Sequence, residues 1–151
     1  MIDYALAGPN DVKEIEESVV LNFGEEIRKL GQDYLKCSFS NDYSKPFFVV
    51  AKTKGKIVGV AAFSEELFTI EVWGISWVSV HTDYRNQGIG GGLVDFCNKE
   101  IERRITTRST VILNTMPGKY KLYEKCGYRI LGEDHSGGFF MTKTIEPKNA
   151  K

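Results

Sequence analysis

The sequence predicts a single mixed α/β domain, and three observations support this prediction. The chain has 151 residues, of which 42% are hydrophobic, so it has the length of one domain and can bury a sizeable core. Strand-like and helix-like segments follow one another in the order β-α-α-β-β-β-α-β-α-β-β. No linker rich in proline, glycine or serine divides the chain. We therefore expect one domain over residues 1–145 and a polar tail over residues 146–151.

A short strand and two helices are expected at the start of the chain. The strand covers residues 2–7, and Gly8-Pro9-Asn10 ends it. Hydrophobic residues then recur at helical spacing in the first helix: Val12, Ile15, Val19 and Phe23. Beyond Gly24 a second helix is expected, with Ile27, Leu30 and Tyr34 on its apolar face. Residues 36–46 are expected to form a loop.

Three strands are expected in the middle of the chain. Residues 47–51 and 56–63 are strand-like, and Lys54-Gly55 between them indicates a hairpin turn. Residues 68–80 form a β-rich run that is largely apolar on both faces, which is typical of a central strand. The two-residue period of a strand places Trp73 and Trp77 on one face, either in the core or beside a binding pocket.

A glycine cluster separates that run from the longest predicted helix. Four glycines lie between positions 88 and 92, and the helix begins in or just after them. Its apolar stripe consists of Leu93, Val94, Cys97, Ile101 and Ile105. A strand over residues 110–114 and a short helix over 120–126, ended by Gly127, are expected next. Two further strands cover residues 128–132 and 139–144.

The glycine cluster predicts an anion-binding site. Glycine lets backbone N–H groups approach a ligand without obstruction by a Cβ atom. The following helix adds free N–H groups and the positive end of its dipole, an arrangement that commonly holds phosphate. Two familiar phosphate loops are excluded by spacing. No Lys-Ser or Lys-Thr follows the glycines, as an NTPase loop requires, and Leu93 stands where a dinucleotide fingerprint needs its third glycine.

The pattern that does match is R-x-x-G-x-G, as Arg85-Asn86-Gln87-Gly88-Ile89-Gly90. It resembles the acetyl-CoA loop of the GCN5-related N-acetyltransferase (GNAT) family, in which it also follows a strand end such as Val78-Ser79-Val80. About 30 residues later, Leu122-Tyr123-Glu124-Lys125-Cys126-Gly127-Tyr128 resembles the second signature of that family, L-Y-x-x-x-G-[FY]. The order of elements agrees with the family fold from residue 2 to residue 144.

The resemblance implies a mixed, mostly antiparallel central sheet flanked by helices, with acetyl-CoA as the acetyl donor. In the family, loop amides hold the pyrophosphate of the cofactor, and the end of the preceding strand pairs with its pantetheine arm. An asparagine that ends the strand before the second motif often contacts the cofactor too, and here it is Asn114, which could instead belong to a turn. The residues expected to bind the cofactor are Val78, Ser79, Val80, Arg85, Asn86, Gln87, Gly88, Ile89, Gly90, Gly91, Asn114 and Tyr123.

The resemblance also implies a general acid. A tyrosine at the position of Tyr123 protonates the leaving CoA thiolate in the family, and a phenol of pKa about 10 is able to do so. The alternative is that Tyr123 serves only packing, with its hydroxyl bonded to the backbone. Tyr120 is the second choice for the acid. Cys126 has no indicated base partner, so direct transfer is expected rather than an acetyl-cysteine intermediate.

The general base is not given by the resemblance. Histone-type members carry a glutamate on the central strand, and the corresponding position here is Gly74. Glu71 lies on the same expected run but on the opposite face by strand alternation. His81 follows the pantetheine segment, and imidazole exchanges protons readily near neutral pH. His81, Glu71 and a chain of water molecules are therefore the alternatives.

The expected function is transfer of the acetyl group of acetyl-CoA to a primary amine by direct attack in a ternary complex. The alternative is a catalytically silent acyl-CoA-binding regulatory module of the same fold. The acceptor is left open between a polyamine, an amino acid, an aminoglycoside-like compound, a protein N-terminus and a lysine side chain. Family members often dimerise, which makes a homodimer an open alternative.

Acidic residues gather on the first two expected helices, which border the acceptor cleft in the family. They indicate either a solvated face or an acidic rim that attracts a cationic acceptor. These residues are Glu14, Glu16, Glu17, Glu25, Glu26 and Asp33.

The charge balance, the hydrophobic pattern and the cysteine content argue against several other classes of protein. Twenty basic residues balance twenty acidic ones, which argues against a dedicated binder of nucleic acid or of an anionic membrane. No apolar run approaches the length of about 20 residues that a membrane helix needs, and residues 1–10 lack the pattern of a secretory signal. Three widely spaced cysteines fit neither a disulfide framework nor a metal site. A reducing cytoplasm is the expected location.

Overall fold

The computed structural model describes residues 1–41, 45–66, 69 and 71–149. Within them, a seven-stranded sheet has the order β1-β2-β3-β4-β5-β7-β6. The strands are β1 (Asp3–Leu6), β2 (Phe47–Thr53), β3 (Lys56–Glu65), β4 (Val72–Val80), β5 (Ser109–Asn114), β6 (Arg129–Glu133) and β7 (Phe139–Ile145). Only the β4–β5 pair is parallel, and every other described pair is antiparallel. The predicted order of elements and the mixed, mostly antiparallel sheet are confirmed.

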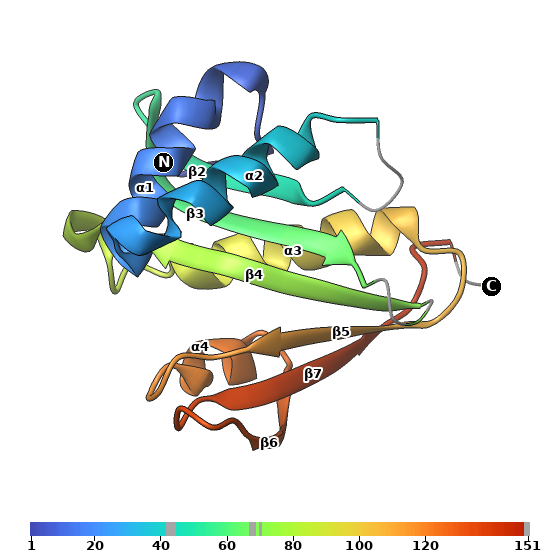
Figure 1. The fold of residues 1–151 in the computed structure, drawn as a ribbon. Coiled ribbons are helices and arrows are strands. Elements are labelled where there is room, and N and C mark those ends of the chain that lie inside the picture. Colours follow the sequence, from blue (N-terminus) through green and yellow to red (C-terminus); the bar gives the residue numbers. More distant parts are fainter. Residues whose placement is uncertain (42–44, 67–68, 70, 150–151) are drawn as a thin grey trace.

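Helices cover both faces of the sheet. Helices α1 (Val12–Phe23) and α2 (Arg28–Ser38) lie over one face, and α3 (Ile89–Arg104) lies behind the other (Figure 1). The short helix α4 (Tyr120–Lys125) contacts α3. Among the described residues, no helix is both long and apolar enough to span a membrane.

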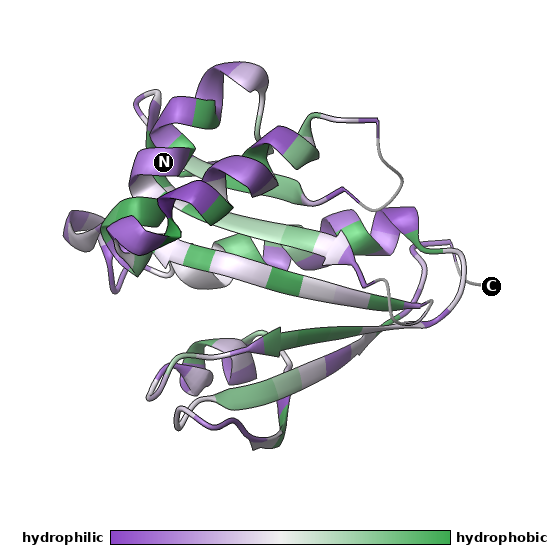
Figure 2. Cartoon of the chain, in the orientation of Figure 1, coloured by the Kyte–Doolittle hydropathy of each residue, from purple (hydrophilic) through white to green (hydrophobic). Residues whose placement is uncertain are grey.

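The two faces have separate cores because neighbouring residues of a strand point to opposite sides. On β2, Val49 and Ala51 face α3, whereas Phe48 and Val50 face α1 and α2. The predicted stripe of α3 is confirmed, since its first four members are fully buried: Leu93, Val94, Cys97 and Ile101. Figure 2 shows hydrophilic and hydrophobic residues mixed along α1 and α2, as expected of helices with one face on the sheet.

The predicted apolar face of α2 is wrong in part. Leu30 is 47% exposed and Tyr34 is 38% exposed, whereas Leu35 is 1% exposed and Gly31 is buried. A 3-10 turn over Glu25–Ile27 precedes α2. The buried face of α2 is set by the packing of this helix against α1. A Cβ atom on Gly31 would lie 3.5 Å from Val19 Cγ1, an ordinary van der Waals distance, so this face of α2 lies against α1. The helix also runs on to Ser38, beyond the predicted start of the loop; residues 42–44 of that loop lie outside the described residues.

This packing predicts different stability effects for two leucines of α2. We expect Leu35→Ala to lower the free energy of unfolding by about 2–5 kcal/mol, because it removes a side chain from a closed core. The matched variant Leu30→Ala is expected to change it by less than about 0.5 kcal/mol, because Leu30 is largely in solvent. Urea unfolding followed by circular dichroism measures both, and a larger effect at Leu30 would contradict the observed face.

Strand β4 contains a bulge that separates the two tryptophans. Opposite β3, Ala62 pairs with Ser76 and Val60 pairs with Ser79, so β4 uses one residue more than its partner. Trp77 lies within this bulge and has a left-handed backbone conformation, with φ 57°. The predicted common face of the tryptophans is therefore wrong: Trp73 packs toward α3, and Trp77 packs toward α1 and α2.

Strand β4 is shorter than predicted and is not buried along its whole length. Strand β4 begins at Val72 rather than at residue 68; Trp73–Ile75 and Ser79 are buried, whereas Ser76 is exposed. Residues 68 and 70 of the predicted run lie outside the described residues.

Candidate active site

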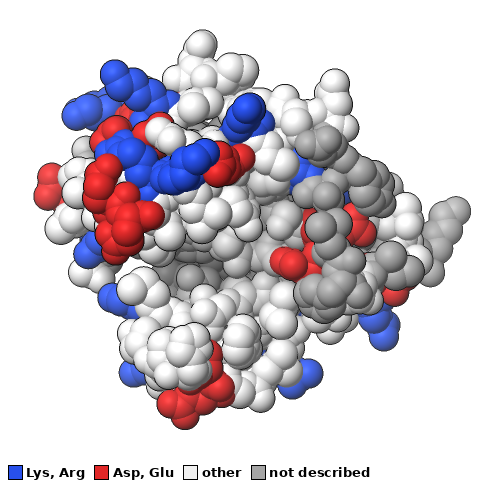
Figure 3. Space-filling view, viewed as in Figure 1, with Lys and Arg blue, Asp and Glu red and all other residues white. Residues whose placement is uncertain are grey.

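A cleft opens where β4 and β5 separate. The two strands pair only between Val72–Gly74 and Thr110–Ile112, and beyond these residues they diverge (Figure 1). A cavity of about 410 Å³ lies at the divergence, and Figure 3 shows a hollow on this face of the molecule. Its lining residues are Tyr34, Ser64, Glu66, Gly74, Ile75, Ser76, Ile112, Leu113, Asn114 and Phe140.

The glycine loop lies at the C-terminal end of β4 and leads into α3. Gly88 has φ 79° and is the N-cap of the helix, and Asn86 precedes it with φ 60°. The first intrahelical bond runs from Gly92 N–H to the Gly88 carbonyl at 3.0 Å. The amides of Ile89, Gly90 and Gly91 therefore have no acceptor within the helix and lie at the positive end of its dipole. Free amides at a helix N-terminus are a geometry that suits an anionic ligand.

Two glycines of the cluster also lie close to side chains of other elements. A Cβ atom on Gly90 would lie 2.8 Å from Leu122 Cδ1, and one on Gly92 would lie 2.1 Å from the Tyr4 hydroxyl oxygen. The first contact brings α4 against the start of α3, and the second seats Tyr4 of β1 on the helix. A Cβ atom on Gly88 would meet nothing within 4 Å. Gly88 is therefore required by its backbone conformation rather than by close packing.

The last residues of β4 have one free edge in the described sheet. They pair with β3 on one side, while β5 has diverged from the other. Ser79 is buried, and its Oγ atom has no hydrogen-bond partner in the described part of the chain. The Val80 carbonyl accepts a hydrogen bond from Arg85 Nε at 3.1 Å, and Arg85 Nη2 donates to Asn22 Oδ1 of α1 at 2.9 Å. Arg85 therefore joins the end of β4 to α1.

Tyr123 lies on α4 beside the start of α3. Its ring makes an edge contact with Tyr128, with the ring centroids 6.4 Å apart. Burial raises the pKa of Tyr123 to about 12, with a smaller contribution from Cys126, so the phenol stays protonated at neutral pH. The Tyr128 hydroxyl donates to Asn98 Oδ1 at 2.6 Å, whereas the Tyr123 hydroxyl has no hydrogen-bond partner in the described part of the chain. The backbone partner expected for a purely packing tyrosine is thus not found there.

Cys126 is a buried thiol next to the glycine loop. Its Sγ atom lies 3.8 Å from the Gly91 carbonyl oxygen. Burial, with a smaller contribution from Asp95, raises the pKa of Cys126 to about 11. The side chain is therefore a thiol at neutral pH, and a thiol is a much weaker nucleophile than a thiolate.

Asn114 lines the cleft and holds a turn at the same time. Its Nδ2 atom donates to Asp134 Oδ2 at 2.7 Å. This bond, followed by bonds from Ser136 and Gly138, holds the pKa of Asp134 well below its usual range. The contact fixes the β6–β7 turn against the end of β5.

The two side chains expected as alternative bases do not line the cleft. His81 caps the 3-10 turn Thr82–Tyr84, where its Nδ1 atom accepts from Asp83 N–H at 3.2 Å. Glu71 precedes β4, and its Oε1 atom accepts from Thr107 Oγ1 at 2.8 Å. The lining instead includes Glu66, which the sequence did not single out.

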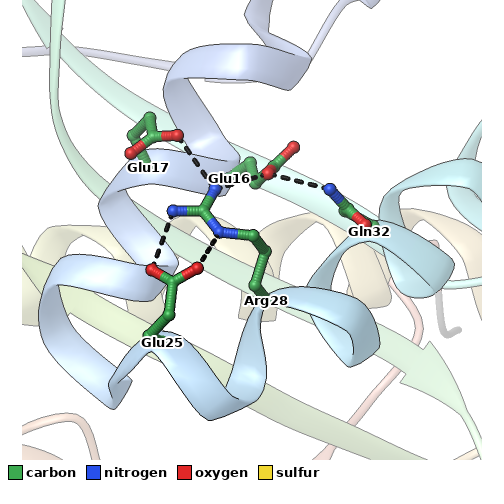
Figure 4. Close-up of polar contacts among 5 residues, drawn as sticks. All are labelled: Glu16, Glu17, Glu25, Arg28 and Gln32. Atoms are coloured by element: carbon green, nitrogen blue, oxygen red, sulfur yellow. Dashed lines mark hydrogen bonds and ion pairs between the residues drawn. The ribbon is translucent and has the colours of Figure 1, made fainter.

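Most of the acidic residues of α1 and α2 already have partners. Arg28 binds Glu16 at 2.6 Å, Glu17 at 3.0 Å and also Glu25, and Gln32 Nε2 donates to Glu16 at 3.0 Å (Figure 4). These contacts join α1 to α2. Asp33 pairs with Lys29, and Glu14 accepts a bond from the Ile57 N–H. This pairing favours the solvated-face interpretation over an acidic rim.

The fold is that of the acyl-CoA N-acyltransferases, as solved structures show. Aminoglycoside 6'-N-acetyltransferase from Enterococcus faecium is similar at 20% identity and a TM-score of 0.76, covering 98% of this chain and 99% of that chain. The GNAT N-acetyltransferase YhbS of Escherichia coli, solved with CoA, is similar at 19% identity and a TM-score of 0.74, covering 95% of this chain and 81% of that chain. The PaiA N-acetyltransferase of Thermoplasma acidophilum, solved with coenzyme A, is similar at 15% identity and a TM-score of 0.73, covering 96% of this chain and 99% of that chain.

A sequence-family model identifies the family directly. The model for the acetyltransferase (GNAT) domain matches residues 44–130, which is more than half of the chain. The chain therefore belongs to the GNAT family, as its two motifs predict. No curated protein matches the sequence.

Proposed function

We propose that this protein transfers the acetyl group of acetyl-CoA to a primary amine. The observation that carries the proposal is the arrangement around the end of β4. Free amides at the start of α3 follow the end of β4, this end of β4 is unpaired on the β5 side, and α4, which carries the protonated Tyr123, contacts α3. Solved relatives of the same fold hold coenzyme A, which supports an acyl-CoA donor.

The residues present fit such a donor. The amides from Gln87 to Gly91 would hold the pyrophosphate at the positive end of α3, with Arg85 nearby for a charge-assisted contact. The backbone of Val78 and Val80 would pair with the pantetheine arm, because this edge of β4 has no strand partner. Asn114 would contact the donor from the end of β5. The bound donor supplies a thioester, which is the activated acetyl group.

The chain's own groups then assist a direct attack. As the amine nitrogen forms its bond to the carbonyl carbon, a backbone N–H of β4 stabilises the developing negative charge on oxygen. As the carbon–sulfur bond breaks, Tyr123 donates its proton to the sulfur, which receives the bonding electrons. The raised pKa of Cys126 supports attack by the amine itself rather than an acetyl-cysteine intermediate.

The acceptor that best fits the cleft is a small-molecule amine. The cavity of about 410 Å³ combines apolar side chains with the hydroxyl groups of Ser64 and Ser76. Such a mixture is typical of small-molecule sites. The similarity to an aminoglycoside acetyltransferase supports the same class of acceptor.

Steady-state kinetics with acetyl-CoA test this function. Release of the CoA thiol is measured with spermidine, kanamycin, amino acids and a lysine peptide as acceptors. We expect turnover with at least one small amine, and intersecting lines when both substrates are varied. Tight acetyl-CoA binding without turnover on any amine would instead support the silent acyl-CoA-binding module, and parallel lines would support an acetyl-enzyme.

A further inference from the structure

The space above Gly74 is already filled by a carboxylate. A Cβ atom built on Gly74 would lie 2.1 Å from Glu66 Oε1, closer than any real contact of that kind. No side chain fits at position 74 while Glu66 keeps this position. The Glu66 carboxylate therefore occupies the volume that a side chain at position 74 would fill.

The backbone holds Glu66 in this position. Glu66 follows directly after β3, and its N–H donates to the Val72 carbonyl at 2.8 Å. Two residues earlier, Ser64 pairs with Gly74 across the two strands. Strand alternation gives Ser64 and Glu66 the same face, and both line the cleft.

The chemistry of the lining makes Glu66 distinctive. It is the only carboxylate among the described lining residues, none of which is a lysine or arginine. In the described part of the chain, its carboxylate forms no ion pair or hydrogen bond. The lining also includes the apolar side chains of Ile75, Ile112 and Phe140. A lone negative charge beside apolar groups favours a cationic partner of complementary charge.

We propose that Glu66 binds the ammonium group of the acceptor and is the general base of the transfer. This inference rests on the proposed acetyl transfer and names the charge of its acceptor: a compact cationic primary amine. Glu66 lines the cleft beside Gly74, whereas His81 and Glu71, the alternatives that the sequence left open, do not line it.

The protons of the step balance. Glu66 accepts one proton from the ammonium, directly or through a water molecule, and later releases it to solvent. The freed lone pair forms the carbon–nitrogen bond, the carbon–sulfur bond breaks, and the sulfur takes a proton from Tyr123. The second proton lost by the nitrogen passes through solvent and restores Tyr123. The products are the N-acetyl amine, CoA thiol and one proton.

Three variants test the role of Glu66. In Glu66→Gln the side chain keeps its size and loses its charge, and Glu65→Gln is the matched control because Glu65 does not line the cleft. The double variant Glu66→Ala/Gly74→Glu moves the carboxylate to the strand position, where removal of the Glu66 side chain makes room for it. Melting temperature and acetyl-CoA affinity are measured for each, together with kcat and kcat/KM for the best amine of the panel over a range of pH.

We expect Glu66→Gln to lower kcat/KM at neutral pH by about a hundredfold or more while acetyl-CoA affinity is unchanged. The deficit should shrink as the pH approaches about 10.4, the pKa of a free alkylamine, because the acceptor then arrives without its extra proton. Glu65→Gln should resemble the wild type, and the double variant should recover activity relative to Glu66→Gln.

The possible failures are distinguishable. An active wild type whose Glu66→Gln variant keeps its rate and pH profile would overturn the role of Glu66 alone. A wild type that binds acetyl-CoA and acetylates no amine would overturn the transfer function, and the base with it. A deficit in Glu66→Gln that stays constant with pH and is not relieved in the double variant would also overturn the proposal, because it indicates a structural role.

Discussion

Tyr123→Phe is expected to lower kcat by about 10²–10⁴-fold, the usual contribution of a positioned acid. The variant removes only the hydroxyl, which has no hydrogen-bond partner in the described chain, so the packing of the ring on Tyr128 should persist. Acetyl-CoA affinity should therefore change little. Rapid-mixing kinetics and calorimetric titration measure the two quantities separately.

Tyr120→Phe is the matched control for this loss. Tyr120 lies on the same helix, and its ring packs on Phe139, with the ring centroids 5.4 Å apart. We expect its variant to keep most of the turnover. Equal losses of turnover and affinity in Tyr123→Phe would contradict the acid assignment, and a selective loss in Tyr120→Phe would transfer it to that residue.

Gly90→Asp is expected to raise the dissociation constant for acetyl-CoA by about a hundredfold or more. The variant places a negative charge at the start of α3, and the juxtaposition of like charges typically costs several kcal/mol. Calorimetric titration of the purified variant measures the loss. Affinity equal to that of the wild type would contradict the placement of the pyrophosphate on the glycine loop.

Gly90→Ala separates charge from packing in this experiment. Its Cβ atom makes the same 2.8 Å approach to Leu122 Cδ1 but adds no charge. Since that atom is the end of a flexible side chain, α4 should adjust, and we expect a much smaller loss of affinity. Thermal melting of both variants shows whether the fold is kept, and an equal loss in Gly90→Ala would assign the effect to the α3–α4 contact.

The fold was predictable because its signals are local. Helical periodicity, turn residues and the glycine cluster each act within a few residues, and they predicted the order of all strands and helices described. The conformation of Gly88 likewise follows from its place between a strand and a helix. The two motifs supplied the family, which local propensity alone does not give.

Two wrong predictions, the buried face of α2 and the common face of the tryptophans, depend on contacts between different elements of the fold. The buried face of α2 is set by its packing against α1, and a helix that offers two apolar faces does not reveal which one is covered. The opposite faces of Trp73 and Trp77 follow from one extra residue in β4, and an alternating pattern carries no sign of a bulge.

Glu66 was missed because its position depends on pairing between strands. In the sequence it is one of two adjacent glutamates after a strand-like run, which is an ordinary strand ending. Only the register of β3 against β4 brings its carboxylate over Gly74. The absence of a side chain at position 74 was a usable signal, since it raised the question of which residue fills that space.

The most direct test of the central claim is calorimetric titration of the wild-type protein with acetyl-CoA, compared with desulfo-CoA. Both ligands retain the pyrophosphate and the pantetheine arm, so we expect both to bind with micromolar dissociation constants and one ligand per chain. Absence of binding by correctly folded protein would contradict the account, and the glycine loop would then serve only the packing of Tyr4 and Leu122 against α3.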